Sequence, residues 1–375
     1  MLVSLVTGTR PQIIKSAPVL NALEKAGVPF EFVHTGQHYD FEMSGTFVKE
    51  FGLDAPLDLG VGSGEYIDQL YLMMKRLSEH YAERRPDYMI VPGDTTSALG
   101  AGLVGFKLEI PVFHLESGLR RYDLSFQEEM NRRLLDHGSS GLFAPTATAV
   151  KNLEMERVLG RIFHIGDTMY DILKQHLPRY SDSRFRDRTL SELGLDVDDY
   201  AVVTVHRRES VDDVSHLAQV VSALNTLDFP VIFPMHPRTQ SKMSQSSLQF
   251  EPHVHVVSPL GYDEFMSLVA ASKLMISDSG GIQKECYLLN VPQVSLQTRT
   301  EWVETCESGA NRLTPLEKGK IVAACKKMYG KKLSNDPSVY GDGRAAERIP
   351  PIITSGDVVI PTDNPAEPYA SRFRF

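Results

Sequence analysis

Cysteine is scarce in this chain, and its pattern excludes two classes of protein. Among 375 residues there are three cysteines, Cys286, Cys306 and Cys325, an odd number without a C-x-x-C pair. A disulfide-stabilised secreted domain and a cysteine-bound zinc site both need more cysteines at closer spacing. This scarcity is typical of a reducing compartment, and we therefore expect a cytoplasmic protein.

Long hydrophobic runs and excess positive charge are also missing. No apolar run approaches the roughly 18 residues that cross a bilayer. The first residues, MLVSLVTGTRP, lack the basic start of a signal peptide and are typical of a buried strand. The chain has 39 basic and 48 acidic residues, a net charge of −9. This balance argues against nucleic acid or an anionic membrane as a partner, although a local arginine cluster can still bind a small anion.

The chain has enough length and apolar content for two domains of about 150–200 residues each. Short apolar runs alternate with amphipathic segments of helical length, which predicts α/β domains with parallel sheets and crossover helices. We expect strands at 2–7, 30–35, 88–92, 111–115, 141–144 and 162–165 in the first half, and at 201–205, 231–234, 253–257, 274–277 and 293–296 in the second. The polar stretch 178–200 between them is interpreted as a surface excursion or linker.

Both halves begin with a β-rich run that ends in a polar turn with arginine, VSLVTGTRPQ and AVVTVHRRES. We therefore predict two Rossmann-like, doubly wound domains facing a central cleft, at 1–170 and 171–350, followed by an irregular tail at 351–375. Ligands of such sheets bind beyond the carboxyl ends of the strands, which is where the polar motifs of this chain fall.

The motif SDSGGIQKE at 277–285 is the best candidate phosphate site. Ser279, Gly280 and Gly281 form a turn after a strand, and the helix that follows offers free N–H groups to an anion. Glu285 lies one helical turn after Gly281 and could accept hydrogen bonds from a ribose diol. The alternative is an ordinary turn in which the serine caps the helix.

Two further motifs follow strands of the first half. GTRPQIIK places Arg10 and Lys15 after the first strand, where a guanidinium can clamp a phosphate; an exposed loop arginine is the alternative. VPGDTTSALG places Asp94 after another strand, with Thr95 and Thr96 able to cap the next helix. By itself Asp94 could also be a simple cap.

The histidines of the second half occur beside arginines. VTVHRRES ends a strand with His206 and Arg207, and FPMHPRT repeats the pattern with His236. A single histidine at a strand end is usually structural, but one followed by two arginines is a candidate for anion binding or proton transfer. The histidine spacing fits no metal motif, so we expect no metal.

The segment HLESGLRRYDLSFQEEMNRR at 114–133 follows another strand with a dense mixture of acids and bases. Glu128 and Glu129 each have an arginine four residues later, and a solvated helix would gain only about 0.3–0.5 kcal/mol from each such pair. Glu116 directly follows a buried strand, where an unpaired carboxylate is costly. This position favours an acid–base site.

Together these motifs resemble the non-hydrolysing UDP-N-acetylglucosamine 2-epimerase family. HTGQHYD, PGDTTS, HLESGLR, EEMNR, HRRES, HPRT and SDSGGIQKE occur in the family's order, and the resemblance covers nearly the whole chain. It implies the two-domain architecture of B-type glycosyltransferases, a UDP-sugar substrate, a homodimer active in polysaccharide biosynthesis, and no cofactor. It also implies catalytic roles for Asp94, Glu116, His206 and Glu128 or Glu129, and nucleotide contacts from Arg10, Lys15, His236, Ser279, Gly280, Gly281 and Glu285.

The family's reaction would eliminate UDP to give a 2-acetamidoglucal and add it back with inversion at C2. A positioned base contributes about 10²–10⁴-fold, too little by itself to remove the C2 proton, so the departure of UDP must lead. Arginines and a helix N-terminus would stabilise the leaving diphosphate. Carboxylates would stabilise the cationic sugar and exchange the proton, and domain closure would retain the glucal.

Other functions stay open on the sequence alone. A hydrolysing 2-epimerase would release UDP and N-acetylmannosamine, and a B-type glycosyltransferase would move the sugar to an acceptor. A binding protein without catalysis is disfavoured because the acidic and histidine motifs are intact. The sugar could be UDP-N-acetylglucosamine or a UDP-2,3-diacetamido uronic acid, since HTGQHYD and TEWVE are similar to a branch that includes enzymes for the latter.

The chain also departs from the family pattern. Gln12 stands where many members have glutamate, Pro92 precedes GDTT, and Gln127 replaces a common proline. In bacterial members a second substrate molecule near a GQH motif activates the enzyme. Gln37 and His38 match that motif, whereas the two residues that follow, Tyr39 and Asp40, differ.

Overall fold

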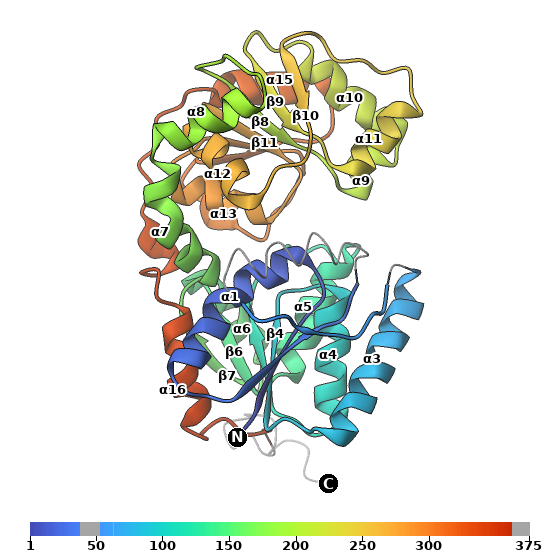
Figure 1. Ribbon diagram of the computed structural model, residues 1–375, viewed down its shortest axis with the longest axis vertical. Helices are drawn as coiled ribbons and strands as arrows, with labels where there is room; N and C mark the ends of the chain where they lie inside the picture. The colour runs from blue at the N-terminus through green and yellow to red at the C-terminus, as the bar shows by residue number, and fades with distance from the viewer. Residues whose placement is uncertain (38–52, 63, 362–375) are drawn as a thin grey trace. The chain divides into compact units, whose positions relative to one another are not determined.

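The computed structural model of the protein describes residues 1–37, 53–62 and 64–361. The chain divides into two compact units, one formed by Met1–Ile172 with Val339–Phe375 and the other by Leu173–Ser338. Each unit is a parallel sheet flanked by helices (Figure 1), which confirms the predicted fold class of two doubly wound α/β domains.

The sheet of the first unit has seven parallel strands in the order β3-β2-β1-β4-β5-β6-β7. They are β1 (Val3–Thr7), β2 (Phe30–His34), β3 (Leu57–Asp58), β4 (Tyr88–Pro92), β5 (Val112–Leu115), β6 (Gly141–Ala144) and β7 (Arg161–His164). The apolar runs predicted all of these except β3. That edge strand is short and exposed, so it leaves no apolar run in the sequence.

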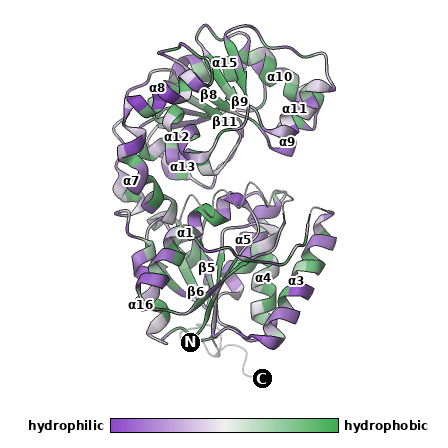
Figure 2. Cartoon of the chain, in the orientation of Figure 1, coloured by the Kyte–Doolittle hydropathy of each residue, from purple (hydrophilic) through white to green (hydrophobic). Residues whose placement is uncertain are grey.

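Helices cover both sides of this sheet. On one side α1 (Arg10–Lys25) lies beside α16 (Ile349–Thr354), and on the other α3 (Tyr66–Glu83), α4 (Thr96–Lys107) and α5 (Gln127–Gly138) pack in a row (Figure 1). Helix α6 (Ala147–Glu156) connects β6 to β7. Leu77, Val104 and Leu135 of the row pack against Val91 and Val112 of the sheet. Figure 2 shows these strands in hydrophobic colours and the outer helix faces in polar ones.

The sheet of the second unit has six parallel strands in the order β10-β9-β8-β11-β12-β13. They are β8 (Ala201–Thr204), β9 (Val231–Pro234), β10 (Val254–Val257), β11 (Leu274–Ser277), β12 (Gln293–Ser295) and β13 (Asn311–Leu313). The sequence predicted five of them. It missed β13, an edge strand whose residues NRL include only one apolar side chain.

After β8, helices lie between the strands of the second unit and after its last strand. They are α9 (Arg208–Val211), α10 (Val214–Leu224), α11 (Pro237–Ser244), α12 (Tyr262–Ala271), α13 (Gly281–Leu288), α14 (Val303–Glu307) and α15 (Lys318–Met328). A core of strand residues such as Val203 and Phe233 packs against Leu224 of α10 and Ile321 of α15.

The stretch 178–200 is more ordered than the predicted surface excursion. It contains the end of α7 (Thr168–Tyr180) and all of α8 (Ser183–Glu192), which packs against α12. Leu190 is buried, and the hydroxyl of buried Tyr200 donates to the carbonyl of Leu268 at 3.0 Å. The prediction failed because α8 buries only one narrow edge, so its sequence is mostly polar.

The C-terminal segment belongs to the first unit, in contrast to the predicted second domain that extends to residue 350. The carboxylate of Asp171 accepts the N–H groups of Ala345 (2.9 Å) and Ala346 (2.8 Å), and the N–H of Asp167 donates to the carbonyl of Tyr340 (2.9 Å). Burial raises the pKa of Asp171 to about 6. These bonds connect segments far apart in sequence, and the predicted irregular tail accordingly begins inside α16.

Each sheet reverses its strand order at one point, between β1 and β4 in the first unit and between β8 and β11 in the second. Ligands of doubly wound sheets bind beyond the carboxyl ends of the strands at this point. Residues 8–10 follow β1 and residues 93–94 follow β4; residues 205–206 follow β8 and residues 278–279 follow β11. The candidate residues therefore lie where the fold is expected to bind ligands.

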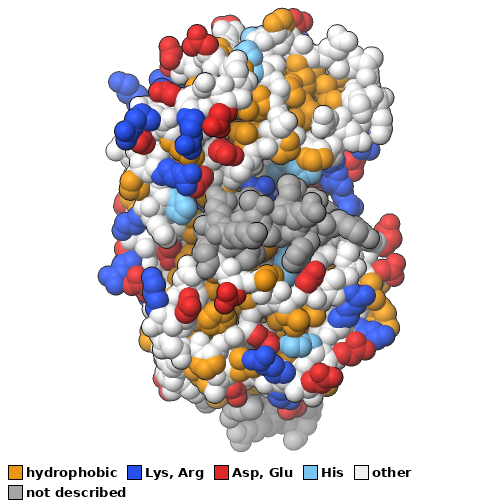
Figure 3. Space-filling model, in the orientation of Figure 1, with side chains coloured by type: hydrophobic (Ala, Val, Ile, Leu, Met, Phe, Trp, Pro, Cys, Tyr) orange, Lys and Arg blue, Asp and Glu red, His pale blue; other side chains and the backbone are white. Residues whose placement is uncertain are grey.

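The surface carries both signs of charge. On the face drawn in Figure 3, acidic and basic side chains alternate over both units in the part of the chain that the structure describes. Within the same residues, no helix is long and apolar enough to cross a membrane.

Candidate functional site

Lys15 and Glu116 form a largely buried ion pair in the first unit. Lys15 lies on α1 and Glu116 follows β5; their side chains are 13% and 8% exposed, and Nζ contacts Oε2. Glu116 has a φ of 66°, a left-handed conformation that residues other than glycine rarely adopt. Such backbone strain is concentrated at functional sites.

Gly93 leaves room for this pair. It has a φ of 69°, and a Cβ atom there would lie 3.1 Å from Nζ of Lys15 and 3.5 Å from Oε2 of Glu116. Both the backbone conformation and the close approach therefore require glycine at the end of β4. The next residue is Asp94, so three candidate site residues lie around one turn.

Asp94 is oriented by α5. Its Oδ2 accepts a hydrogen bond from Nε of Arg132 at 2.8 Å, and its carbonyl accepts one from Nδ2 of Asn131 at 2.8 Å. The helix α4 is capped instead by Thr95, whose hydroxyl accepts the N–H of Ala98 at 3.2 Å. Asp94 is therefore not a simple cap. Its side chain stays 28% exposed, which leaves an oriented carboxylate within reach of a ligand.

Glu128 and Glu129 point in different directions. Glu129 is fully buried: Oε2 accepts the N–H of Arg121 (2.8 Å), Oε1 accepts the N–H of Tyr122 (3.2 Å), and Arg132 lies 3.3 Å from Oε2. Glu128 is exposed at the start of α5. Adjacent helical residues are about 100° apart, which explains the separation. Both oxygens of Glu129 are thus used within the protein.

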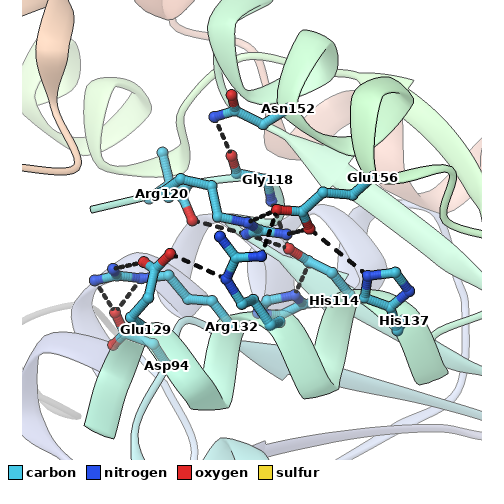
Figure 4. Close-up of polar contacts among 12 residues, drawn as sticks. Asp94, His114, Gly118, Arg120, Glu129, Arg132, His137, Asn152 and Glu156 are labelled. Carbon is cyan, nitrogen blue, oxygen red and sulfur yellow. Dashed lines mark hydrogen bonds and ion pairs between the residues drawn. The ribbon is translucent and has the colours of Figure 1, made fainter. Parts of the chain in front are cut away.

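A fully buried histidine lies beside the turn after β4 (Figure 4). His114 Nε2 is 2.7 Å from the carbonyl oxygen of Gly93, and its Nδ1 is 2.6 Å from Oδ1 of Asp136. Oδ2 of Asp136 accepts the N–H of Gly118 at 3.1 Å and Nη1 of Arg120 at 2.7 Å. Burial alone would raise the pKa of this carboxyl, but His114 and Arg120 hold the pKa of Asp136 below its ordinary value.

Arg120 connects Asp136 to the end of α6. Its Nε and Nη2 donate to the two oxygens of Glu156 at 2.9 and 2.6 Å, a bidentate pair (Figure 4). Burial alone would raise the pKa of Glu156, but Arg120 and Arg133 hold it below its ordinary value. The buried guanidinium is therefore balanced by two ionised carboxylates.

Replacing Glu156 by glutamine is expected to lower the melting temperature near neutral pH and to have a smaller effect in acid. The substitution leaves the buried guanidinium of Arg120 with one charged partner, at a cost of about 1–3 kcal/mol. Because the folded-state pKa of Glu156 is depressed, its stabilising contribution is complete above the ordinary carboxyl range and is lost as the pH falls through the depressed value. Calorimetry of wild type, Glu156→Gln and the exposed control Glu154→Gln at about pH 7 and about pH 3 measures this difference. Equal decreases at both pH values would contradict it.

Gln12 joins the turns after β1 and β4. Its Oε1 accepts the N–H groups of Gly8 (2.8 Å) and Thr9 (3.2 Å), and its Nε2 donates to the carbonyl of Pro92 (2.7 Å). The side chain is buried. An ionised glutamate here would have no donor for the carbonyl of Pro92, so this link between the two turns depends on the amide of Gln12.

Replacing Gln12 by glutamate is expected to reduce the free energy of unfolding by about 1–3 kcal/mol, because the carbonyl of Pro92 loses its donor and faces a carboxylate. Urea unfolding of Gln12→Glu, with the exposed control Gln127→Glu, measures the change. An unfolding free energy equal to that of wild type would show that the hydrogen bond to Pro92 is not needed.

In the second unit, a buried carboxylate orients the turn after β8. Oδ2 of Asp278 accepts the N–H groups of His206 (3.0 Å) and Arg207 (2.8 Å), and its Oδ1 lies 3.5 Å from Nδ1 of His206. The His206 side chain is 39% exposed. The ring of His236, which caps α11 by accepting the N–H of Arg238 at 3.1 Å, lies 5.6 Å from that of His206. Two imidazole rings therefore lie side by side at strand ends.

The two glycines of the turn before α13 differ in their surroundings. A Cβ atom at Gly280 would lie 2.4 Å from Oε1 of Glu301, whereas one at Gly281 would meet no atom within 4 Å. The N–H of Ser279 donates to the hydroxyl of Ser277 at 2.9 Å, and the cap position is Gly280. The alternative interpretation of Ser279 as the helix cap is therefore wrong.

Glu285, on α13, is held by a tyrosine. The hydroxyl of Tyr262 donates to its Oε1 at 2.7 Å, and both residues are buried. Burial, together with the Glu285 carboxylate, raises the pKa of Tyr262 well above its ordinary value. Tyr262 is thus a permanent donor that fixes the carboxylate and leaves the other carboxylate oxygen to a different donor.

The remaining predicted residues have mixed placements. Arg10 opens α1 and is partly exposed. His38, Tyr39 and Asp40 lie outside the described residues. Within the described part of the chain, no group of three or more His, Cys, Asp or Glu side chains could hold a metal ion.

The chain matches the family model described as UDP-N-acetylglucosamine 2-epimerase over residues 21–354. It belongs to this family. A UDP-N-acetylglucosamine 2-epimerase from Methanocaldococcus jannaschii is 37% identical over 366 residues, which cover 95% of this chain and 100% of the relative. A UDP-2,3-diacetamido-2,3-dideoxy-D-glucuronate 2-epimerase from Pseudomonas aeruginosa is 36% identical over 358 residues, 93% of this chain and 98% of the relative. The resemblance inferred from the motifs is confirmed, and the chain is an enzyme of the 2-epimerase class.

Solved structures agree with this assignment. The 2-epimerase of M. jannaschii in complex with UDP-GlcNAc and UDP has a TM-score of 0.88 at 37% identity, over 95% of this chain and 100% of that one. The 2-epimerase from Neisseria meningitidis, bound to UDP-GlcNAc, has a TM-score of 0.84 at 29% identity, over 95% and 100%. A spinosyn rhamnosyltransferase shares the fold alone, with a TM-score of 0.52 at 12% identity over 96% and 97%.

Sequence reasoning missed the residues that hold the 2-epimerase motifs in place. Asp278 lies inside the quoted motif SDSGGIQKE, and His114 opens the quoted segment HLESGLRR, yet neither was chosen. Asp136 and Glu156 lie outside all of the motifs. Asp278 could have been found because it is a polar residue directly at a strand end. The sequence contains no comparable signal for Asp136 or Glu156.

Proposed function

We propose that this protein epimerises a UDP-2-acetamido sugar at C2 by reversible elimination of UDP. The observation that carries the proposal is the turn around Gly93, where the Lys15–Glu116 ion pair and the oriented Asp94 lie beside one another in the first unit. Membership of the 2-epimerase family, and the relatives and structures named above, support the same substrate class.

The reaction proceeds in two steps. The bond between C1 and the diphosphate oxygen breaks, the C2 proton leaves to a base, and a 2-acetamidoglucal with free UDP results. UDP oxygen then returns to C1 while a proton reaches the opposite face of C2. UDP is both leaving group and nucleophile and no electrons are gained or lost, so this chemistry calls for no cofactor.

The first unit would act on the sugar. Asp94 and Glu116 are the proposed acid–base and cation-stabilising carboxylates, and inversion at C2 needs groups on both faces. Glu128, exposed at the start of α5, is the better candidate for a third sugar contact, because Glu129 uses both oxygens inside the protein. Lys15 would pair with Glu116, and Arg10 would contact the diphosphate.

The second unit would bind UDP. Ser279, Gly280 and Gly281 offer the helix start to the diphosphate, and Arg207 and His236 supply positive charge or donors. Glu285, fixed by Tyr262, would accept the ribose hydroxyls. His206, partly exposed and oriented through Asp278, would exchange a proton with the departing diphosphate or the sugar.

The sugar and the fate of UDP are tested by product analysis. We expect UDP-N-acetylglucosamine, or the UDP-2,3-diacetamido uronic acid, to be converted to its C2 epimer with UDP still attached, as seen by NMR and chromatography. Free N-acetylmannosamine with UDP would indicate the hydrolysing reaction. Transfer of the sugar to an added acceptor would indicate a B-type glycosyltransferase.

We further propose a cytoplasmic homodimer that serves polysaccharide biosynthesis. Three cysteines without a disulfide suit a reducing compartment. Ile67 and Tyr71 of α3 are 75% and 62% exposed, and Met130 and Leu134 of α5 are 42% and 47% exposed. Each pair is four residues apart, so each presents one apolar helix face that a second copy could cover. A mass of one chain by light scattering would rule the dimer out.

A further inference from the structure

A buried network behind the acid–base turn has no part in the proposed chemistry. It consists of His114, Asp136, Arg120 and Glu156, which come from β5, α5, the loop after β5 and α6 (Figure 4). The side chains of His114, Asp136 and Arg120 have no exposed surface. Burying so many ionisable groups is costly unless each is paired, and here each of them is.

Asp136 connects the two loops that carry the proposed carboxylates. Through His114 it reaches the carbonyl of Gly93, the residue before Asp94. Through Oδ2 it accepts the N–H of Gly118, two residues after Glu116. One buried carboxylate therefore sets the relative positions of both loops.

Both ring nitrogens of His114 face acceptors. A carbonyl oxygen can only accept, and the Asp136 carboxylate is ion-paired with Arg120 and accepts the N–H of Gly118, so it also faces the ring as an acceptor. Each nitrogen must then carry a hydrogen, so the geometry requires the imidazolium form. The ring contacts Asp136, which is paired with Arg120, and the carbonyl of Gly93, whose Cα lies beside the Lys15–Glu116 pair.

The bond to Gly93 restrains the residue that follows it. The peptide between Gly93 and Asp94 is planar, so fixing its carbonyl oxygen fixes the whole peptide plane. Arg132 holds the far end of the Asp94 side chain. His114 and Arg132 thus restrain Asp94 from its two ends, one from β5 and one from α5.

We propose that His114, with both N–H groups engaged by Gly93 and Asp136, is the positioning residue that sets the reach of Asp94 toward the sugar. This inference rests on the proposed epimerase function. His114 does not touch the substrate; it acts through the peptide plane before Asp94. A displacement of about 1 Å at a reacting group can cost about 10²-fold in rate.

Replacing His114 by phenylalanine removes the hydrogen bond while keeping a ring of similar shape. We expect kcat to fall by about 10²-fold, with KM and UDP affinity within about threefold of wild type. The control is His164→Phe, at an exposed histidine that ends β7. A kcat within about threefold of wild type in a folded His114→Phe protein would overturn the inference.

Replacing Asp136 by asparagine distinguishes a loss of kcat caused by displacement of Asp94 from one caused by misfolding. The amide oxygen can accept the hydrogen bonds from Gly118 and Arg120. The NH₂ group can donate to Nδ1 of a neutral His114 ring. That neutral ring still donates from Nε2 to the carbonyl of Gly93. In a protonated ring, Nδ1–H and NH₂ would oppose each other. We expect kcat of Asp136→Asn to be near that of wild type at about pH 8.5 and about tenfold or more below it at about pH 5.5.

Histidine-selective ¹⁵N NMR provides a readout that does not depend on turnover. We expect the His114 signal, identified by its absence in His114→Phe, to be that of an imidazolium in wild type and of a neutral ring in Asp136→Asn at about pH 8. A wild-type ring in the neutral form, or an Asp136→Asn rate ratio that does not change with pH, would overturn the inference. A failure of the proposed function would be recognised separately. In that case the wild-type protein would leave every UDP-2-acetamido sugar unchanged, whichever form of the His114 ring the NMR signal shows.

Discussion

Replacing Asp94 by asparagine is expected to reduce kcat by about 10³-fold or more while UDP binds as in wild type. The substitution keeps the size of the side chain, the carbonyl contact with Asn131 and the cap at Thr95. It removes the charge that Arg132 orients toward the open side of the turn. An amide neither takes a proton from C2 nor stabilises a cationic sugar, so the chemical step loses most.

The measurement pairs kcat and KM for epimerisation with UDP binding by calorimetry. Asp68→Asn, at an exposed acid in the first turn of α3, is the matched control and should behave as wild type. Near-normal turnover by Asp94→Asn would refute the assigned role. A loss of UDP affinity as large as the loss of rate would assign Asp94 to nucleotide binding.

Replacing Lys15 by methionine and Glu116 by glycine together is expected to abolish turnover, by about 10³-fold or more, without lowering the melting temperature. Exchanging a buried ion pair for apolar groups is often neutral or stabilising. Glycine also adopts the φ of 66° at position 116 without the strain that glutamate has there. The Lys15–Glu116 pair would thus contribute to catalysis and not to the stability of the fold.

The single variant Lys15→Met is the control for this second prediction. It leaves the carboxylate of Glu116, 8% exposed, without its cation, which costs about 3–5 kcal/mol. Thermal unfolding should therefore rank the double variant at or above wild type and Lys15→Met well below it. A double variant that turns over normally, or one that is less stable than Lys15→Met, would contradict this interpretation of the pair.

The sequence predicted the sheets well because buried parallel strands have continuous apolar runs. Runs such as 88–92 and 231–234 coincide with β4 and β9. The failures share one cause: β3, β13 and α8 are short or exposed elements whose residues bury little apolar surface. The return of the C-terminal segment to the first unit depends on hydrogen bonds to Asp171, which leave no local pattern.

The sequence offers candidate site residues for a related reason, and their roles stay predictions. Residues at strand ends, such as Asp94, Glu116 and His206, can be chosen because doubly wound sheets bind ligands there. The sequence left the role to Glu128 or Glu129, and only burial shows that Glu129 is the inner one.

The residues that hold these side chains in place could not be predicted. Gln12 bonds to a carbonyl 80 positions away, and Asp136 meets His114 across 22 positions. Each partner is an ordinary polar residue in its own segment. Only the fold brings the pairs together, so a single sequence contains no local signal for them.

The deuterium content of C2 after incubation with UDP-N-acetylglucosamine in D₂O tests the central claim most directly. Loss and return of the C2 proton predicts that NMR will show deuterium at C2 in UDP-sugar of both configurations, with UDP retained. The diacetamido uronic acid serves as the second substrate in the same assay. Epimers formed without deuterium, or an absence of exchange with every UDP-2-acetamido sugar offered, would contradict the proposed mechanism.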